Sequence, residues 1–149
     1  MQSLGAEAVA ASLDELGNLT DAMRGCAAVI HAAAKVDDWG DRDEFFRVNV
    51  RGTENALSAA RTAGVGRFVH VSTEAVLADG RPIVRADETR PRARHPVGLY
   101  PLTKGLAEER ALAANSAEME SIVVRPRFVW GAGDTTVLPK LSAAVRTLP

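Results

Sequence analysis

The sequence predicts an α/β fold built on a parallel sheet. Two apolar runs, AAVIHAAA (27–34) and RFVHVST (67–73), lack the strict alternation of a half-exposed strand and are typical of strands buried on both faces. A helical pattern over 44–66 separates them, and helical and strand patterns continue to alternate after them. The length of 149 residues fits one domain.

The first half of the chain supplies the elements around these runs. Residues 6–12 are a strand candidate diluted by Ala, and residues 19–25 are a short helix with Thr20 as its N-cap and Gly25 at its end. In the helix over 44–66, small residues recur at spacings of three and four, and glycines stop it at Gly64 and Gly66. This pattern predicts a helix that packs closely against its neighbours.

The second half continues the alternation. Residues 79–97, which are rich in Pro and Arg, are predicted to form a long loop that is either solvated or faces an anionic substrate. A helix follows from Tyr100 to about residue 115, then a strand over 121–126 and an amphipathic helix from residue 137.

Composition excludes several classes of function. The net charge of −1 gives no support to binding of nucleic acid or an anionic membrane, and no apolar run is long enough to span a bilayer. Cys26 is the single cysteine, so the chain predicts neither an internal disulfide nor a Cys-based metal site. We expect a cytoplasmic protein with no bound metal.

The chain's single tyrosine stands four residues before a lysine, so Tyr100 and Lys104 project from one face of a helix. A lysine cation lowers the pKa of a nearby phenol, which is otherwise about 10, and lets it exchange protons with an alcohol or carbonyl oxygen. A hydroxyl of Ser72 or Thr73 could orient that oxygen, and Asn49 could hold a water or the lysine. Taken singly, each of these residues also fits an ordinary surface or capping role.

Five motifs occur together in one order: VIHAAA (29–34), NVRGT (49–53), RFVHVSTEAV (67–76), YPLTKGLAE (100–108) and RPRFVWGAGD (125–134). The set resembles the extended short-chain dehydrogenase/reductase family, on its 3β-hydroxysteroid dehydrogenase and dihydroflavonol-reductase side, which also contains the NAD-dependent epimerases and dehydratases. The resemblance implies a partial Rossmann-type, doubly wound parallel sheet. Residues 1–149 would supply strands 3 to 6 of an NAD(P)-binding domain.

The resemblance also implies roles for particular residues. Tyr100 would be the general acid/base, Lys104 would tune it and bond the cofactor ribose, Thr73 would hold the substrate oxygen and Asn49 would complete the set. The cofactor, NAD or NADP, would contact the residues Ala32, Ala33, Ala34, Ser72, Lys104 and Pro126. A small-molecule substrate would meet Glu74, Arg127 and Trp130.

The chain departs from the family pattern at its start, because it has no Gly-rich turn to cradle a pyrophosphate. We therefore expect a fragment that lacks this motif and the C-terminal substrate region, binds neither cofactor tightly alone, and self-associates or is poorly soluble. NAD cannot be told from NADP. The family often dimerises through the helices that here carry Asn49 and Tyr100, so the resemblance also implies a homodimer.

Three functions are compatible with these motifs. The leading one is oxidoreduction of a hydroxyl or ketone, and the others are a nucleotide-sugar epimerase or dehydratase and a non-catalytic dinucleotide-binding fragment. Dehydratases often follow the catalytic Thr with two acids, whereas Thr73 is followed by Glu74 and Ala75, which weakens that subclass. His31 and His70 lie in the predicted strands and are expected to be core residues with satisfied hydrogen bonds.

Overall fold

The computed structural model describes residues 5–146 except 38, 128 and 136, and it contains one parallel sheet. Its strands are β1 (Ala28–His31), β2 (Arg67–Val71) and β3 (Glu120–Val124), in the order β1-β2-β3. The α/β class and the parallel sheet are thus confirmed.

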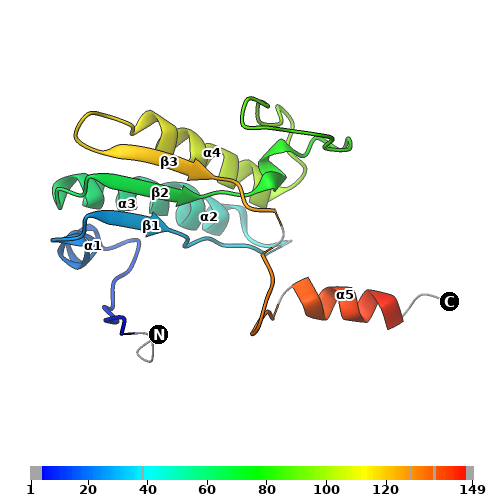
Figure 1. Cartoon of the computed structure of the whole chain (residues 1–149), viewed down its shortest axis with the longest axis horizontal. Coiled ribbons are helices and arrows are strands. Elements are labelled where there is room, and N and C mark those ends of the chain that lie inside the picture. Colours follow the sequence, from blue (N-terminus) through cyan, green and yellow to red (C-terminus); the bar gives the residue numbers. More distant parts are fainter. Residues whose placement is uncertain (1–4, 38, 128, 136, 147–149) are drawn as a thin grey trace.

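Helices cover one face of this sheet. The helical segments of the described chain are α1 (Leu16–Met23), α2 (Arg42–Phe45), a π-helical segment (Phe46–Arg51), α3 (Gly52–Thr62), a 3₁₀ turn (Glu74–Leu77), α4 (Leu99–Ala113) and α5 (Val137–Arg146). Figure 1 shows α2, α3 and α4 behind the sheet, whereas α5 projects away from it. The single long helix expected over 44–66 is therefore continuous in the chain but changes its winding in the middle.

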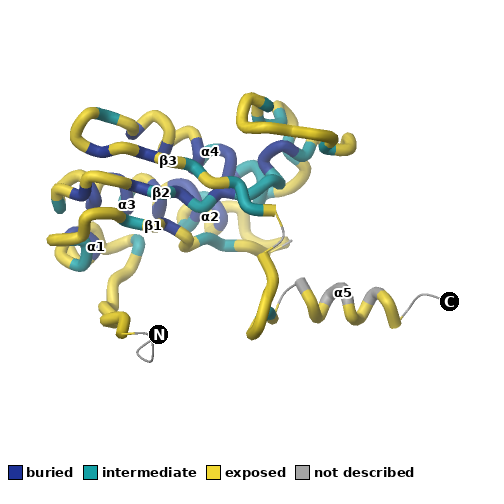
Figure 2. Tube along the Cα trace, in the orientation of Figure 1, coloured by how far each residue is buried: buried dark blue, intermediate teal, exposed yellow. Residues whose placement is uncertain are grey.

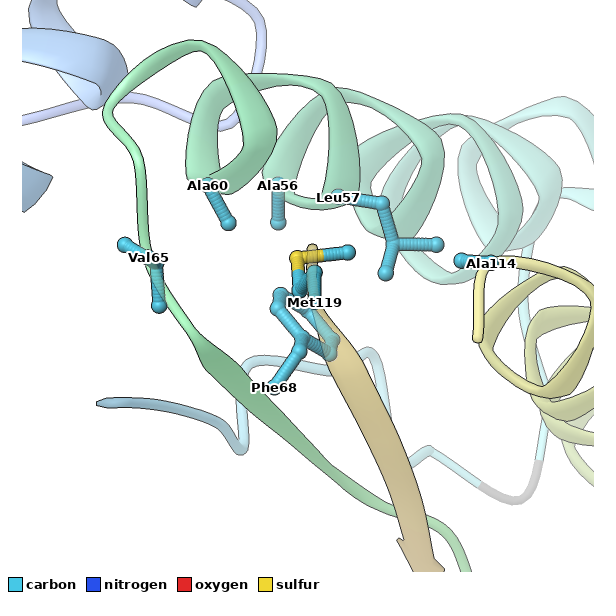
Figure 3. Packing of buried hydrophobic residues seen from close by; sticks show 7 residues of the cluster. All are labelled: Ala56, Leu57, Ala60, Val65, Phe68, Ala114 and Met119. Carbon is cyan, nitrogen blue, oxygen red and sulfur yellow. The ribbon is translucent and has the colours of Figure 1, made fainter. Parts of the chain in front are cut away.

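The core lies between α3, β2 and the start of β3. Its buried side chains are Ala56, Leu57, Ala60, Val65, Phe68, Ala114 and Met119 (Figure 3). The small residues let α3 approach the sheet closely, as their spacing predicted. Gly52 also allows a close approach, because a Cβ there would lie 2.9 Å from Cδ1 of Leu13 and that side chain would have to shift.

The opposite face of the sheet is open in the part of the chain that the structure describes (Figure 2). Burial alternates along the strands: Phe68 is fully buried, whereas Ile30, Ile122 and Val124 are 72%, 43% and 41% exposed. The expectation of strands buried on both faces is therefore wrong for the described chain. The apolar residues that suggested it are present, but nothing described packs on half of them.

Some expected boundaries are also wrong. Residues 6–12 form no strand, because Ala is a poor strand former and Val9, which is 60% exposed, has no neighbouring strand to pair with. The described sheet therefore has three strands rather than four. Thr20 lies inside α1 and is not its N-cap, and its hydroxyl donates to the Leu16 carbonyl at 2.8 Å. Gly25 does end this region in a left-handed conformation, with φ of 76°.

Candidate active site

The candidate site is assembled where the carboxyl ends of β1 and β2 meet the start of α4. Tyr100 lies in the first turn of α4, Thr73 follows β2 by two residues, and Asn49 lies in the π-helical segment before α3. Hydrogen bonds join these elements to one another. Parallel α/β sheets place their functional loops at this edge.

Lys104 links α4 to the end of β2. Its side chain is almost fully buried, and Nζ donates to the carbonyl of Val71 at 2.6 Å. Burial lowers the pKa of Lys104 to about 8, an effect that the negative charge of Glu108 partly offsets. Lys104 thus lies one helical turn after Tyr100, and its ammonium is held on Val71, two residues before Thr73 in the chain. It gives up its proton more readily than an exposed lysine does.

The two hydroxyls after β2 point to different surroundings. Ser72 is buried and donates to Oε2 of Glu108 at 2.9 Å. Thr73 accepts the Ala75 backbone N–H at 3.2 Å, so its own proton remains available for a further acceptor. The half-buried Tyr100 side chain makes no hydrogen bond with the described residues. These placements fit Thr73 and Tyr100 as the groups that meet a substrate oxygen, which stays a prediction.

Both ends of the Asn49 amide are hydrogen-bonded. Oδ1 accepts the Lys35 backbone N–H at 2.7 Å, while Nδ2 donates to the Lys35 carbonyl at 3.1 Å and to Oγ1 of Thr103 at 2.9 Å. Both amide protons are therefore used, and Oδ1 keeps one lone pair with which it could still accept from a water or a substrate. Asn49 fastens the segment that follows β1 to the first turns of α4. The π-helical winding around it, which is frequent at functional sites, was not foreseen from the sequence.

A buried histidine pair lies beneath this edge. Oγ1 of Thr53 donates to the Asn49 carbonyl at 2.7 Å, so Nε2 of His31 is the donor in its 3.0 Å bond to Thr53. Burial, reinforced by the charge of Lys104, lowers the pKa of His31 to about 4 and that of His70 to about 3. The expectation of a satisfied core histidine is confirmed for His31. It is wrong for His70, because neither ring nitrogen has a partner among the described residues.

The predicted cofactor contacts lie at the same edge of the sheet. Ala32 and Ala33 are exposed and Ala34 is half-buried directly after β1. Pro126 follows β3, and its carbonyl accepts the backbone N–H of Glu74 at 3.2 Å. The nicotinamide–ribose half of a dinucleotide is compatible with small side chains and a buried lysine here. The described chain offers no Gly-rich turn for the pyrophosphate.

The predicted substrate residues are partly brought together. Glu74 pairs with Arg127 at 3.2 Å. Trp130 is 67% exposed, so the described residues leave most of its side chain uncovered. The described residues contain no cluster of three or more metal-ligating side chains. None of the helices in the described ranges has the length and hydropathy that crossing a membrane requires.

Comparison with known proteins identifies the family. Residues 3–148 match the model of the 3-beta hydroxysteroid dehydrogenase/isomerase family. The chain is 48% identical over 147 residues to the 4-hydroxy-2-methyl-3-oxo-4-farnesyl-3,4-dihydroquinoline-1-oxide ketoreductase of Stigmatella aurantiaca, covering 99% of this chain and 44% of that protein. It is 38% identical over 143 residues to a 3 beta-hydroxysteroid dehydrogenase/Delta 5-->4-isomerase of Mycobacterium tuberculosis, covering 87% of this chain and 39% of that protein.

Solved structures agree. A short-chain dehydrogenase/reductase superfamily protein from Agrobacterium tumefaciens with bound NAD matches with a TM-score of 0.70 and 39% identity, over 84% of this chain and 38% of that one. The chain thus spans less than half the length of the relatives it matches. With its five ordered motifs and parallel sheet, it belongs to the 3-beta hydroxysteroid dehydrogenase/isomerase family, within the extended short-chain dehydrogenases/reductases.

Proposed function

We propose that this chain supplies the acid/base part of an NAD(P)-dependent oxidoreductase that interconverts a ketone and an alcohol on a small molecule. The observation that carries the proposal is the buried Lys104, which lies one helical turn after Tyr100 on α4 and whose ammonium is fixed on the carbonyl of Val71, two residues before Thr73 in the chain. The similarity to a ketoreductase supports the ketone as the reacting group.

The reaction divides between the cofactor and the chain. When bound, the nicotinamide supplies or accepts the hydride. Tyr100 gives its phenolic proton to the oxygen of the reduced substrate, or takes a proton from an alcohol in the reverse direction. The Lys104 cation stabilises the phenolate that remains. Thr73, whose proton is not used within the chain, donates a hydrogen bond to the same substrate oxygen.

The cofactor is proposed to lie across the ends of β1 and β2. Ala32 and Ala33 leave room for it, and Lys104 would bond the ribose. Asn49 would act indirectly, since its amide is occupied by Lys35 and Thr103. These assignments give each side chain a task that its contacts allow.

The test uses an extended protein, in which this chain is part of a polypeptide as long as its relatives. Tyr100→Phe should lower the rate of ketone reduction by about 10²–10⁴-fold, the range for loss of a general acid/base, while calorimetry shows unchanged binding of NAD or NADP. Thr62→Val is a matched control, because it also removes one hydroxyl but lies exposed on α3. If the Phe variant kept its rate to within a few-fold, Tyr100 would not be the acid/base.

A further inference from the structure

A fully buried carboxylate lies one helical turn beyond Lys104. Glu108 on α4 has no exposed surface, and it accepts from Arg125 at both oxygens, at 3.1 Å from Nε and 2.5 Å from Nη2. Ser72 donates to it as well, and Nε of Arg92 lies 3.8 Å away. Partners of this number and charge offset the hydration that a carboxylate loses when it is buried.

One set of contacts fixes the strand end that carries Thr73. The Ser72 hydroxyl is held by Glu108, and the Ser72 backbone N–H donates to the Val124 carbonyl at 2.8 Å. On the other side of Thr73, the N–H of Glu74 donates to the Pro126 carbonyl at 3.2 Å. Thr73 is therefore bracketed by two fixed residues, one of which depends on Glu108.

A second set fixes the loop over residues 79–97. Arg125 donates to both oxygens of Glu108 and also to the Arg90 carbonyl, at 3.5 Å. Arg92 bonds the Gly105 carbonyl and Glu109 on α4. The N–H of Ala93 then donates to the Val76 carbonyl at 2.8 Å. The loop was expected either to be solvated or to face an anionic substrate. Because Arg92 is bonded to α4, a fully solvated loop does not describe it.

We propose that Glu108 is a positioning residue that couples the loop over 79–97 to the strand end carrying Thr73, so that one buried carboxylate sets both. The inference rests on the proposed function, because it gives Thr73 a catalytic role. Between the loop and β3 lies a cavity of about 860 Å³, and its lining includes Glu74, Arg125 and Glu108 itself. The coupling therefore also sets the shape of that cavity.

The sequence offers an internal control for this role. Glu109 is the next residue on α4 and also pairs with Arg92, but its side chain is 47% exposed. Exposed ion pairs contribute little, whereas removal of one charge from a buried pair leaves the other uncompensated. Glu108→Gln and Glu109→Gln make the same chemical change one residue apart, so they separate the buried hub from the surface pair.

Amide hydrogen exchange on this chain tests the coupling, and the amides of Glu74 and Ala93 report the two sides. Glu108→Gln should raise exchange at both by at least about ten-fold, with Glu109→Gln changing neither by more than about three-fold. The mid-strand amide of Phe68 should stay protected. Acceleration on one side only, equal effects of the two variants, or uniform acceleration that includes Phe68 would overturn the proposal.

Two milder variants keep the test informative if Glu108→Gln folds poorly. Ser72→Ala should raise exchange at Glu74 alone, and Arg92→Gln should raise it at Ala93 alone. Absence of either local effect would contradict the two-sided hub. Because exchange needs neither cofactor nor substrate, these results do not depend on whether the proposed reaction is correct.

A kinetic measurement tests the positioning role itself, in the extended protein used for Tyr100→Phe. Ser72→Ala should lower kcat by about ten-fold, because the Ser72 hydroxyl is held by Glu108 and steadies Thr73. The KM for the cofactor should stay unchanged, because the hydroxyl proton is donated to Glu108 and is not available for the cofactor contact that the resemblance implies. An unchanged kcat would overturn the positioning role. Inactivity of the unsubstituted extended protein would instead count against the proposed function.

Discussion

Replacement of Lys104 by Met should make the folded chain more stable while abolishing the proposed chemistry. Lys104 is 2% exposed, so its ammonium loses most of its hydration on folding, and its one hydrogen-bond partner among the described residues is the Val71 carbonyl. Met has a similar length and helix propensity and carries no charge. Glu108 keeps Arg125 as its counter-ion in the variant.

The magnitude follows from the pKa of the lysine. A fall from 10.5 to about 8 means that folding disfavours the charged form of Lys104 relative to the neutral form by about 3 kcal/mol, at about 1.4 kcal/mol per pH unit. The Met variant escapes this cost but leaves the Val71 carbonyl without its donor, a loss of about 1 kcal/mol. We expect a net gain of about 2 kcal/mol at pH 7, which is about 4–8 °C in Tm for a chain of this size.

The gain should depend on pH with a definite sign. Between pH 8 and 10.5 the unfolded chain still binds the lysine proton and the folded chain does not, so the stability of the wild type rises with pH in this window. The difference between the variant and the wild type should therefore shrink as the pH approaches 10. His31 and His70 face the same region, but both are neutral throughout this window because their pKa values lie near 4 and 3.

Urea unfolding at pH 7 and at pH 9.5 measures both effects. Lys35→Met is the matched control: hydrogen bonds to Asp37 and Glu44 raise the pKa of Lys35, so its positive charge stabilises the folded state. That variant should lose stability at pH 7, the opposite sign. A Lys104→Met protein that is less stable than the wild type at pH 7, or whose gain does not shrink at pH 9.5, would refute the reasoning.

Three further outcomes are expected. In the extended protein, Thr73→Val should lower kcat at least about ten-fold more than Ser72→Ala, because only Thr73 has a proton to offer the substrate; the reverse ranking in steady-state kinetics would move the role to Ser72. His70→Phe should raise Tm, because neither ring nitrogen of His70 has a partner among the described residues, and it should flatten the loss of stability as the pH falls from 6.5 towards 3; a Tm and a pH dependence of Tm equal to those of the wild type would contradict this. Ile122→Glu on the open sheet face should reduce self-association, seen as a later elution volume on a sizing column, and an unchanged volume would show that this face is not used.

Local sequence patterns predicted correctly those helices and strands whose local preference is also favoured by the packing of the fold. The helix carrying Tyr100, the helix of small residues and the two apolar strands were foreseen because their periodicity and glycine stops are local signals. The strand expected over 6–12 was wrong because a strand needs a neighbour, and Val9 has none in the described chain. The pairing of strands, unlike the winding of a helix, cannot be decided by one segment alone.

The candidate site shows the same division. Motif spacing placed Tyr100 and Lys104 on one helix, but it gave no sign that the Asn49 amide is spent on Lys35 and Thr103. The choice between the two adjacent hydroxyls of Ser72 and Thr73 also depends on a contact between elements, because the Ser72 hydroxyl donates to Glu108. Such contacts depend on distances between elements, which no spacing within an element contains.

Glu108 shows why a charged residue in a motif can mislead a reader of sequence. On a helix wheel it lies one turn from Lys104, which predicts a simple i,i+4 pair of opposite charge. In the structure its hydrogen bonds go instead to Ser72 and Arg125, from the ends of two neighbouring strands. The loss of hydration of a buried carboxylate is offset only when positive charges and hydrogen-bond donors surround it, and here they come from several elements. A fully buried acid beside a proposed catalytic lysine is therefore evidence that the surrounding strand ends and loop are held as one unit, and the exchange experiment at Glu74 and Ala93 measures that unity directly.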